Sequence, residues 1–573
     1  MPQEEESKYS RRQFLRLGWT VGAGLVMPAA LSSCDRGGDS EQPLPVETFV
    51  EPTTLASVNG ELDVTLTLTY FRTMLYDRAV TLRSMNSSIP APTLHVDVGD
   101  RLRIQVINQL PPNPPSGEPA KHLRYPNSTN LHLHGLHVTP GLVSPGVYGD
   151  YVMDDPQLGV QPGYTRQHEY RIGLDQPPGA YWYHPHLHGA TAIQVGSGMA
   201  GALIIKGAID QVPEIAAAVE RVFVFQAPIT DATGTLESFT QVVDIPLTEP
   251  PFLINGVRRP RLVMRRGEVQ NWHFINAAIF NFLNLSLDDH ALNVYSLDGN
   301  PRGSMLPVGP FPVPTSGNQT GVVLAPGNRA SVLVKAGAAG TYFLRTLQFP
   351  IGIEEAILSE DILAEVVVVD EARAMALPAG LLPVPASLAA ITDEELANAG
   401  GLKRYIVMRA VFAAPVADQA ASSVVHPGSE VDDWFYQTAN TPLANRVFAL
   451  GAASEQASTA PGLPNEFIPF QSSRALKQTV ALGSVEEWTI FNMNNIRHPF
   501  HIHINPFQVV KINGQPVEPF WADTIALPPG GSPAEPTSVT FRTRFRDFAG
   551  TYVMHCHMLA HEDMGMMQMI EVV

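Results

Sequence analysis

Residues 98–108 read VGDRLRIQVIN, and this stretch decides the fold class. A turn glycine, Gly99, is followed by apolar residues that alternate with polar ones, and the run ends at Asn108. Successive side chains of a β-strand point to opposite faces, so the alternation predicts a half-buried strand. The same pattern, with the same glycine-to-asparagine spacing, recurs at residues 266–276 (RGEVQNWHFIN) and 482–492 (LGSVEEWTIFN). Three copies of one strand indicate three copies of one domain.

A second short pattern closes each copy. It reads GAYWY at residues 179–183, GTYFL at 340–344 and GTYVM at 550–554. Two ordered patterns in three copies predict an all-β chain of three Greek-key β-sandwich domains.

We place the domains at residues 46–210, 215–372 and 403–573. The stretch 373–402 is rich in Ala and Pro and is expected to be the linker between the last two domains. Within it, residues 392–395 (TDEE) have the pattern of a capping box, which predicts one short helix.

The composition is that of a packed globular protein. The 573 residues are too many for one hydrophobic core, and 45% of them are hydrophobic while only 16% are charged. Fifty prolines and 45 glycines favour a turn-rich β architecture. The net charge of -18 argues against nucleic acid as a partner, because phosphate binding needs clustered Lys and Arg. The two cysteines, Cys34 and Cys556, have separate expected roles, so we expect no disulfide.

Residues 1–34 resemble a twin-arginine export signal. Residues 10–16 (SRRQFLR) carry the arginine pair, and an apolar run that is too short for a good membrane span follows. Residues 31–34 (LSSC) resemble a bacterial lipobox, in which Cys34 becomes the lipid-bearing first residue of the mature protein. Ordinary signal-peptidase cleavage nearby is the alternative. We therefore expect export to the periplasm or cell surface, with residues 35–45 as a flexible tether to the membrane.

Most of the 18 histidines lie in four clusters. Each cluster holds one His-x-His pair: His132/His134, His184/His186, His501/His503 and His555/His557. A strand places both imidazoles of such a pair on one face, where they can bind one metal ion or two adjacent ions. Two pairs fall in the first domain, two in the third and none in the second. Eight imidazoles brought together at a domain interface would hold more than one ion.

Cys556 stands between His555 and His557 and is expected to point to the opposite face of their strand. With His498, His561 and a weak axial methionine it has the ligands of a blue-copper electron-transfer site. Zinc is the competing metal, but zinc sites do not usually include a methionine or lie beside a second cluster of histidines. Electrons that leave Cys556 need to cross only two residues of backbone to reach that cluster.

The four clusters, in this order, resemble those of the multicopper oxidase family of laccases and bacterial cuprous oxidases. The resemblance covers about residues 50–573 and implies cupredoxin-like domains, four copper ions, and dioxygen as electron acceptor. It implies a type 1 copper bound by His498, Cys556, His561 and Met566, a type 2 copper bound by His132 and His501, and a type 3 pair bound by His134, His184, His186, His503, His555 and His557. Met566 rather than Met567 matches the axial position because it lies ten residues after Cys556.

The second domain differs from its neighbours after the closing pattern. His184 follows it in the first domain and His555 in the third, whereas Arg345 follows it in the second. We therefore expect the second domain to supply no copper ligand and to be a spacer that orients the other two.

Reducing dioxygen to water needs protons at a buried cluster, and a carboxylate near the histidines is the natural carrier. Glu562 directly follows His561, and the cuprous-oxidase branch has an acid at the matching place. Asp150 is the second candidate, and Asp154 and Asp155 compete with it in the same acid-rich loop.

The remaining histidines have no predicted metal role. We expect His137 and His188, which lie inside the clusters but off the ligand positions, to support the site. The others are expected to be structural: His95, His122, His168, His273, His290 and His426.

The substrate is less clearly encoded. Cuprous oxidases often carry a methionine-rich insert in the last domain, and none is found between Leu402 and Ala481. Phenols and aromatic amines are therefore the first expectation and cuprous ion the second. A copper-free scaffold protein would lack the ligands that are intact here. A copper nitrite reductase usually has two domains and assembles its site between subunits.

Overall fold

The computed structural model describes residues 47–75, 77–113, 125–153, 159–237, 242, 251–310, 320–352, 357–358, 360–412, 446–453, 466–468, 470, 477–530 and 536–573. The expected export signal and tether, with Cys34, lie outside the described residues, as do His122, Asp154, Asp155 and His426. Most of the regular structure in the described part is β-strand, which confirms the predicted fold class.

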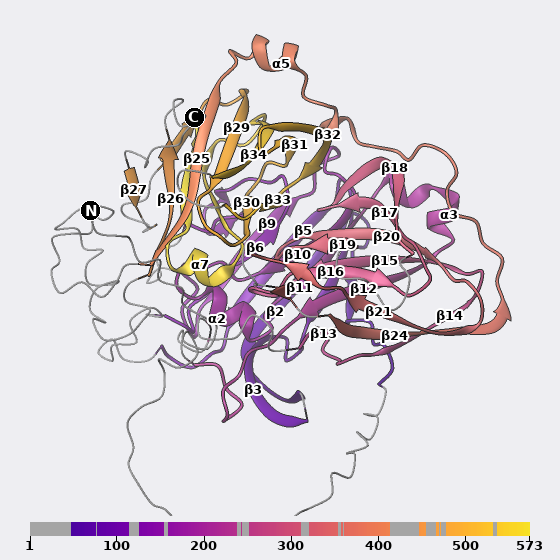
Figure 1. Cartoon of the computed structure of the whole chain (residues 1–573). Helices are drawn as coiled ribbons and strands as arrows, with labels where there is room; N and C mark the ends of the chain where they lie inside the picture. Colours follow the sequence, from indigo (N-terminus) through magenta and orange to yellow (C-terminus); the bar gives the residue numbers. More distant parts are fainter. Residues whose placement is uncertain are drawn as a thin grey trace, which may run out of the picture. The chain divides into compact units, whose positions relative to one another are not determined.

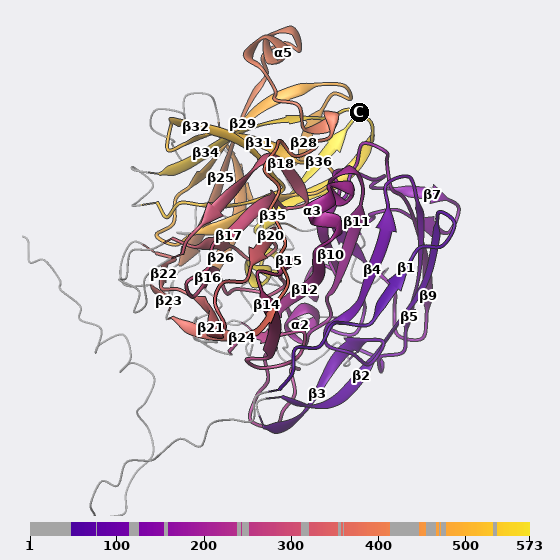
Figure 2. The ribbon, with the colours of Figure 1, turned by 90° about the vertical axis from the view of Figure 1, so that its right-hand side faces the viewer.

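Three stretches of chain each form two large sheets. Residues 54–206 form the first two sheets. One has the strand order β3 (Arg78–Met85), β2 (Glu61–Leu75), β5 (Arg101–Asn108), β9 (Thr165–Arg171), β8 (Val147–Tyr148) and β7 (Leu142–Ser144). The other has the order β1 (Thr54–Ala56), β4 (Ala91–Asp97), β11 (Gly201–Lys206), β10 (Gly179–His184) and β6 (His132–His134). Figure 2 shows the violet strands β1 to β5 of this stretch gathered on one side of the ribbon.

The second stretch, residues 219–372, repeats this arrangement. Its sheets run in the orders β13 (Leu253–Ile254), β12 (Val219–Gln226), β15 (Val269–Asn276), β20 (Arg329–Lys335), β17 (Leu292–Leu297) and β18 (Asn300–Val308), and β14 (Arg261–Arg266), β24 (Asp361–Ala372), β21 (Gly340–Thr346), β16 (Leu283–Leu287) and β19 (Val322–Leu324). In addition, β22 (Phe349–Pro350) and β23 (Ile357–Leu358) pair as a two-stranded antiparallel sheet.

Residues 403–572 form the last two sheets. Their orders are β27 (Glu466–Ile468), β26 (Arg446–Ala453), β25 (Lys403–Phe412), β29 (Val485–Asn492), β34 (Thr537–Arg544), β31 (Phe507–Ile512) and β32 (Gln515–Ala522), and β28 (Lys477–Val480), β36 (Met567–Val572), β35 (Gly550–Cys556), β30 (His498–Ile502) and β33 (Thr524–Leu527). All three repeated strands of the sequence, β5, β15 and β29, therefore occupy interior positions of their sheets.

The asparagine that ends each repeated strand also closes the turn after it. Asn108, Asn276 and Asn492 are the last residues of β5, β15 and β29, as predicted. The Nδ2 atom of each donates to two backbone carbonyls at 2.7 to 3.0 Å, and its Oδ1 accepts the N–H two residues further on. The glycines that precede the strands have positive φ angles, at Gly99 (94°), Gly267 (79°) and Gly483 (84°).

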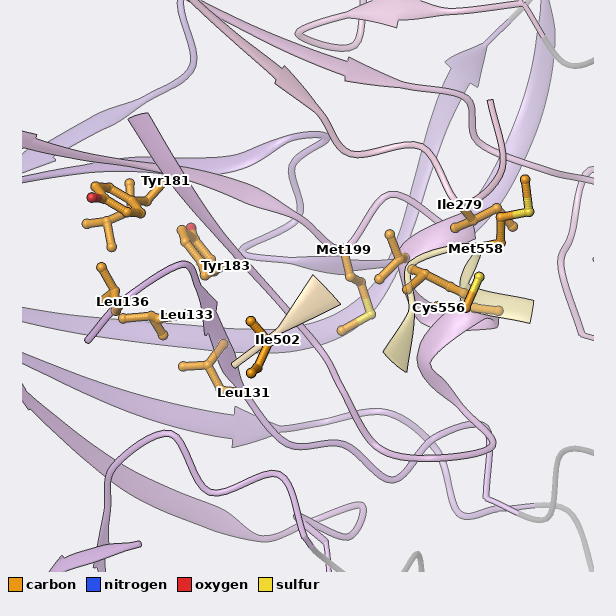
Figure 3. Packing of buried hydrophobic residues seen from close by; sticks show 14 of the residues in the cluster. Leu131, Leu133, Leu136, Tyr181, Tyr183, Met199, Ile279, Ile502, Cys556 and Met558 are labelled. Atoms are coloured by element: carbon orange, nitrogen blue, oxygen red, sulfur yellow. The ribbon is translucent and has the colours of Figure 1, made fainter. Parts of the chain in front are cut away.

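Apolar packing joins the stretches to one another. β15 is buried along its whole length because one of its faces packs against β10, where Trp182 shares an apolar cluster with Ile275. A larger cluster includes Tyr183 from the first stretch, Ile279 from the second and Cys556 from the third, and Figure 3 shows these side chains in one close view. The candidate metal residues therefore lie in a core to which all three stretches contribute.

The described helices are short: α2 (Thr191–Gly196), α3 (Pro213–Ala216), α5 (Asp393–Asn398) and α7 (Leu559–Asp563), with 3-10 turns η1 (Ala208–Gln211) and η2 (Ala386–Leu388). α5 is the helix predicted from the capping-box pattern, and Glu395 N donates to the Thr392 hydroxyl at 3.0 Å. Helices α2 and α7 contact each other, and Figure 1 shows them side by side. None of the described helices combines the length and apolar character needed to cross a bilayer.

Candidate metal centre

Two pairs of neighbouring strands carry the histidine clusters. β6 pairs with β10 so that His132 lies opposite His184, and β30 pairs with β35 so that His501 lies opposite His555. The side chains of all four His-x-His pairs are buried. Histidines from the first and third stretches thus converge on one buried region.

The expectation that each His-x-His pair lies on a single strand is correct only for His132 and His134 on β6. β10 ends at His184, β30 at Ile502 and β35 at Cys556. The second histidine of each of these pairs follows the end of its strand and reaches the cluster from the segment beyond it.

One group of imidazoles consists of His132, His134 and His501, whose ligand nitrogens lie within 4.8 Å of one another. The rings of His134 and His501 stack with their centroids 3.8 Å apart. The Nε2 atoms of all three rings are buried and have no hydrogen-bond partner. Buried polar atoms of native proteins nearly always have a partner, so these three nitrogens fit a metal ion.

A second group consists of His186, His503 and His555. Their Nε2 atoms lie 3.0 Å (His186 to His555), 3.2 Å (His186 to His503) and 3.3 Å (His503 to His555) apart. Three ring nitrogens that face one another in this way cannot all be paired as donor and acceptor, whereas a cation at their common point would satisfy all three.

His184 and His557 complete the eight. Their rings lie 5.7 Å apart, and Nε2 of each is buried without a partner. Burial lowers the pKa of His184 to about 3, which favours the neutral imidazole that binds metal ions. Burial and neighbouring imidazoles also lower the pKa of most other members of the cluster: His132, His134, His186, His503, His555 and His557.

A separate group is centred on Cys556. Its Sγ lies 3.5 Å from Nδ1 of His498 and 3.8 Å from Nδ1 of His561, and the two nitrogens are 3.3 Å apart. Burial lowers the pKa of His498 to about 3, whereas burial raises the pKa of the Cys556 thiol. A buried thiol of raised pKa ionises only with a cation beside it, so one sulfur and two imidazole nitrogens at these distances fit a soft metal such as copper.

Met566 lies beside this group. Its N–H donates to His561 O at 2.9 Å, and its carbonyl accepts from Cys556 N at 3.0 Å. Its side chain is buried in the cluster that contains Cys556, whereas Met567 packs in a different cluster. Met566, unlike Met567, therefore packs in the same apolar cluster as Cys556.

Glu562 is fully buried on α7 between two of the histidines. Its Oε1 accepts from the Thr191 hydroxyl at 3.1 Å and lies 3.5 Å from His186 Nδ1, while Oε2 lies 3.9 Å from His555 Nδ1. Burial, followed by the charge of Asp563, raises the pKa of Glu562 well above its usual value. A carboxyl group that tends to hold a proton thus lies beside the imidazole cluster.

Asp150 bridges two imidazole groups. Its Oδ1 accepts from His132 Nδ1 at 2.8 Å and from Leu133 N at 3.1 Å, and its Oδ2 lies 3.3 Å from His503 Nδ1. A carboxylate on Nδ1 holds the ring in the tautomer whose Nε2 is free for a metal. The competing residues Asp154 and Asp155 lie outside the described residues.

The two off-position histidines have contacts of their own. His137 Nδ1 lies 3.0 Å from Ile504 O, and Nε2 lies 3.1 Å from Asp547. His188 lies near Glu562 and Asp563. Asp563 itself accepts the backbone N–H of the chain around the start of α2, at Gly189, Thr191 and Ala192.

Sequence reasoning missed a buried ion pair behind the cluster. Arg329 on β20 donates to both carboxylate oxygens of Asp523, and both side chains are buried. Neither residue stands in a histidine motif, so only their places in the folded chain reveal the pair. By contrast, Arg345 pairs with Asp288. In the described part of residues 219–372, no residue belongs to a group that could hold a metal ion.

Three models of multicopper oxidase domains match the chain, at residues 121–209, 227–360 and 446–573. The chain belongs to the multicopper oxidase family. Membership of this family implies that the protein is an oxidoreductase and that copper is its cofactor. The groups of buried, partnerless imidazole nitrogens and the Cys556 group fit that metal.

This multicopper oxidase has distant relatives of similar length. It is 23% identical to the multicopper oxidase mco of Staphylococcus haemolyticus over 499 residues, 85% of this chain and 83% of that protein. It is 24% identical to laccase-2 of Botryotinia fuckeliana over 527 residues, 85% of this chain and 78% of that protein.

Solved structures share its fold. A multicopper oxidase from Campylobacter jejuni, described as a metallo-oxidase, aligns with a TM-score of 0.64 at 21% identity over 92% of this chain and 95% of that one. A laccase-like oxidase from Ochrobactrum sp. aligns with a TM-score of 0.64 at 20% identity, over 93% of this chain and 100% of that one.

Proposed function

We propose that this oxidase removes electrons one at a time from a small-molecule reductant and uses four of them to reduce dioxygen to water. One observation carries the proposal. Cys556 belongs to one metal-type group, and its chain neighbours His555 and His557 belong to the imidazole cluster. A single peptide bond on each side of Cys556 thus joins an electron-entry site to a site with room for several ions.

We assign four copper ions to these residues. The type 1 ligands are His498, Cys556, His561 and Met566, the type 2 ligands are His132 and His501, and the type 3 ligands are His134, His184, His186, His503, His555 and His557. Copper bound there supplies one-electron chemistry at the first group and dioxygen chemistry at the cluster.

Glu562 is proposed as the residue that holds and delivers protons at the cluster. It is buried, its pKa is raised, and its Oε2 has no hydrogen-bond partner. Asp150 is the second candidate and also orients His132 and His503. Four protons and four electrons balance the conversion of one dioxygen to two waters.

Phenols and aromatic amines are the proposed substrates. The chain between Leu402 and Ala481 contains a single methionine, Met408, so it offers no methionine-rich site for cuprous ion. The Ochrobactrum oxidase, whose structure shares this fold, is described as acting on lignin model compounds, which are aromatic. Cuprous ion stays the alternative substrate.

The test is metal analysis followed by oxygen uptake. The purified, copper-loaded protein should hold about four copper ions per chain. It should consume oxygen with a phenol and with an aromatic amine. A protein that binds no copper would contradict the oxidase assignment, and uptake with cuprous ion alone would replace the proposed substrate class.

Export and membrane attachment are part of the proposal. The arginine pair at Arg11 and Arg12 supports the twin-arginine route, and Cys34 supports a lipid anchor on the mature protein. The oxidase would then act in the periplasm or at the cell surface.

A further inference from the structure

The turn that leads into β20 packs directly against the histidine cluster. Gly327 in this turn has a φ of +88°, and a Cβ atom added to it would lie 2.9 Å from ring atoms of His557. The next residue, Asn328, donates from Nδ2 to Thr524 O at 2.9 Å. The turn comes from the stretch 219–372, whose described residues contribute none of the cluster's imidazoles.

Arg329 follows immediately and reaches further into the site. Its Nη1 and Nη2 donate to the two carboxylate oxygens of Asp523 at 2.8 and 2.6 Å. Nη1 also lies 3.1 Å from His134 Nδ1, and Nε donates to Ala180 O at 3.3 Å. The planar guanidinium is therefore held on three sides, with one edge against His134.

Asp523 connects the same pair to a second imidazole. Its backbone carbonyl accepts from His501 Nδ1 at 2.8 Å. The Thr524 hydroxyl donates to Asp523 Oδ1 at 2.8 Å and lies 3.1 Å from the same His501 nitrogen. His134 and His501 are the two rings that stack at 3.8 Å. Asp523 Oδ1 lies 3.7 Å from His134 Nδ1 and 3.5 Å from His501 Nδ1, so the carboxylate that Arg329 holds faces the Nδ1 atom of both rings.

The Arg329–Asp523 pair also leaves no room for a side chain at the residue after His134. Gly135 follows His134 and has a φ of +92°, and a Cβ atom there would collide with Arg329 Nη2 and Asp523 Oδ2. A buried ion pair contributes little net stability, because desolvation offsets much of the attraction. Its contacts with His134 and His501, two candidate metal ligands, therefore indicate a role at the metal site and not in overall stability.

We propose that Arg329 is a positioning residue of the copper cluster: its fork on Asp523 sets the orientation of the His134 and His501 rings. The second domain thus contributes to the copper site without binding copper. This inference rests on the proposed function, because it takes the two rings as copper ligands.

The test compares Arg329→Lys with the unaltered holoenzyme. Lysine keeps the charge but loses the planar fork. We expect copper affinity of the cluster, measured by competition with a chelator, to fall by about 10- to 100-fold. The hyperfine splitting of the type 2 copper in electron paramagnetic resonance should shift, while the blue absorption that arises at Cys556 stays unchanged.

Two further variants complete the experiment. Asp523→Asn keeps the size of the side chain but removes the carboxylate on which Arg329 forks, and it decides by the same criteria if Arg329→Lys does not fold. Arg345→Lys is the matched control. Arg345 forms a similar fork on Asp288, with hydrogen bonds of 2.7 and 3.1 Å, but neither residue belongs to the histidine cluster. This variant should leave copper affinity and both spectra unchanged.

The outcomes separate this inference from the proposed function. Unaltered protein that binds no copper overturns the proposed function and the inference with it. Unaltered protein that binds copper, with Arg329→Lys of unchanged affinity and unchanged type 2 spectrum, overturns the inference alone. An equal loss in Arg345→Lys would also overturn it, because the effect would then be general.

Discussion

Cys556 is the residue on which the proposed electron path depends. Replacing it with Ser removes the soft ligand and leaves an alcohol that stays protonated near neutral pH, so the blue absorption should vanish. Substrate oxidation should fall to background. The imidazole cluster uses no atom of this side chain, so metal analysis should still find roughly three copper ions. A Cys556→Ser protein that stays blue, or that still oxidises phenols, would overturn both site assignments.

Glu562 is the residue expected to supply protons. Glu562→Gln keeps an oxygen for the Thr191 hydroxyl but cannot give up a proton, so turnover with oxygen should fall by about a hundredfold or more. Copper content and the blue absorption should not change. Glu394→Gln on the exposed face of α5 is the control and should have normal turnover. Unimpaired turnover of Glu562→Gln would leave Asp150 as the proton carrier.

At this scale, sequence reasoning was most informative where the proposed ligands recur in short motifs, and their binding of copper stays a prediction. The residues proposed as ligands share a few local patterns, and the structure brings them into buried groups. Arg329 and Asp523 were missed because they are 194 residues apart and neither belongs to a repeated pattern. Their pairing depends on how β20 meets the strand that begins at Thr524, which no local pattern encodes.

Among the elements, the repeated strands were the most predictable. Their alternation and their final asparagine follow from local chemistry, and β5, β15 and β29 end at the expected residues. The end of β10 also has a local signal that sequence reasoning overlooked, because Pro185 has no N–H to continue the ladder. The end of β30 has no such signal, because the chain turns away at Ile504, a residue with a φ of +67° that its side chain does not favour.

The terminal asparagines offer a test of stability. Asn276→Ala removes two donated bonds, to Asn281 O at 2.8 Å and Leu324 O at 3.0 Å, and the bond that Ala278 N makes to it. Each buried group left without a partner costs about 1–3 kcal/mol. We expect the unfolding midpoint in urea to fall clearly. Asn398→Ala, at the exposed end of α5, is the control, and an equal midpoint in the two variants would contradict the argument.

For the whole molecule, the proposed anchor is the feature that can be tested most directly. If Cys34 carries a lipid, Cys34→Ala should move the protein from the membrane fraction to the soluble fraction. Activity per copper should be unchanged, since the residues proposed as copper ligands all lie between residues 132 and 566. Fractionation followed by an oxygen-uptake assay measures both quantities. A Cys34→Ala protein that stays in the membrane fraction would contradict the lipid anchor.

The histidines of the cluster come from distant parts of the chain: His186 and His555 lie 3.0 Å apart at Nε2 but 369 residues apart in sequence. A ribosome adds about 5–20 residues per second, so the second set emerges roughly 20–70 seconds after the first. Until then the early histidines have no partners across the cluster. Under the proposed assignment, metal loading is therefore among the last events of biosynthesis, and a chain stopped before His555 would not hold the full set of ions.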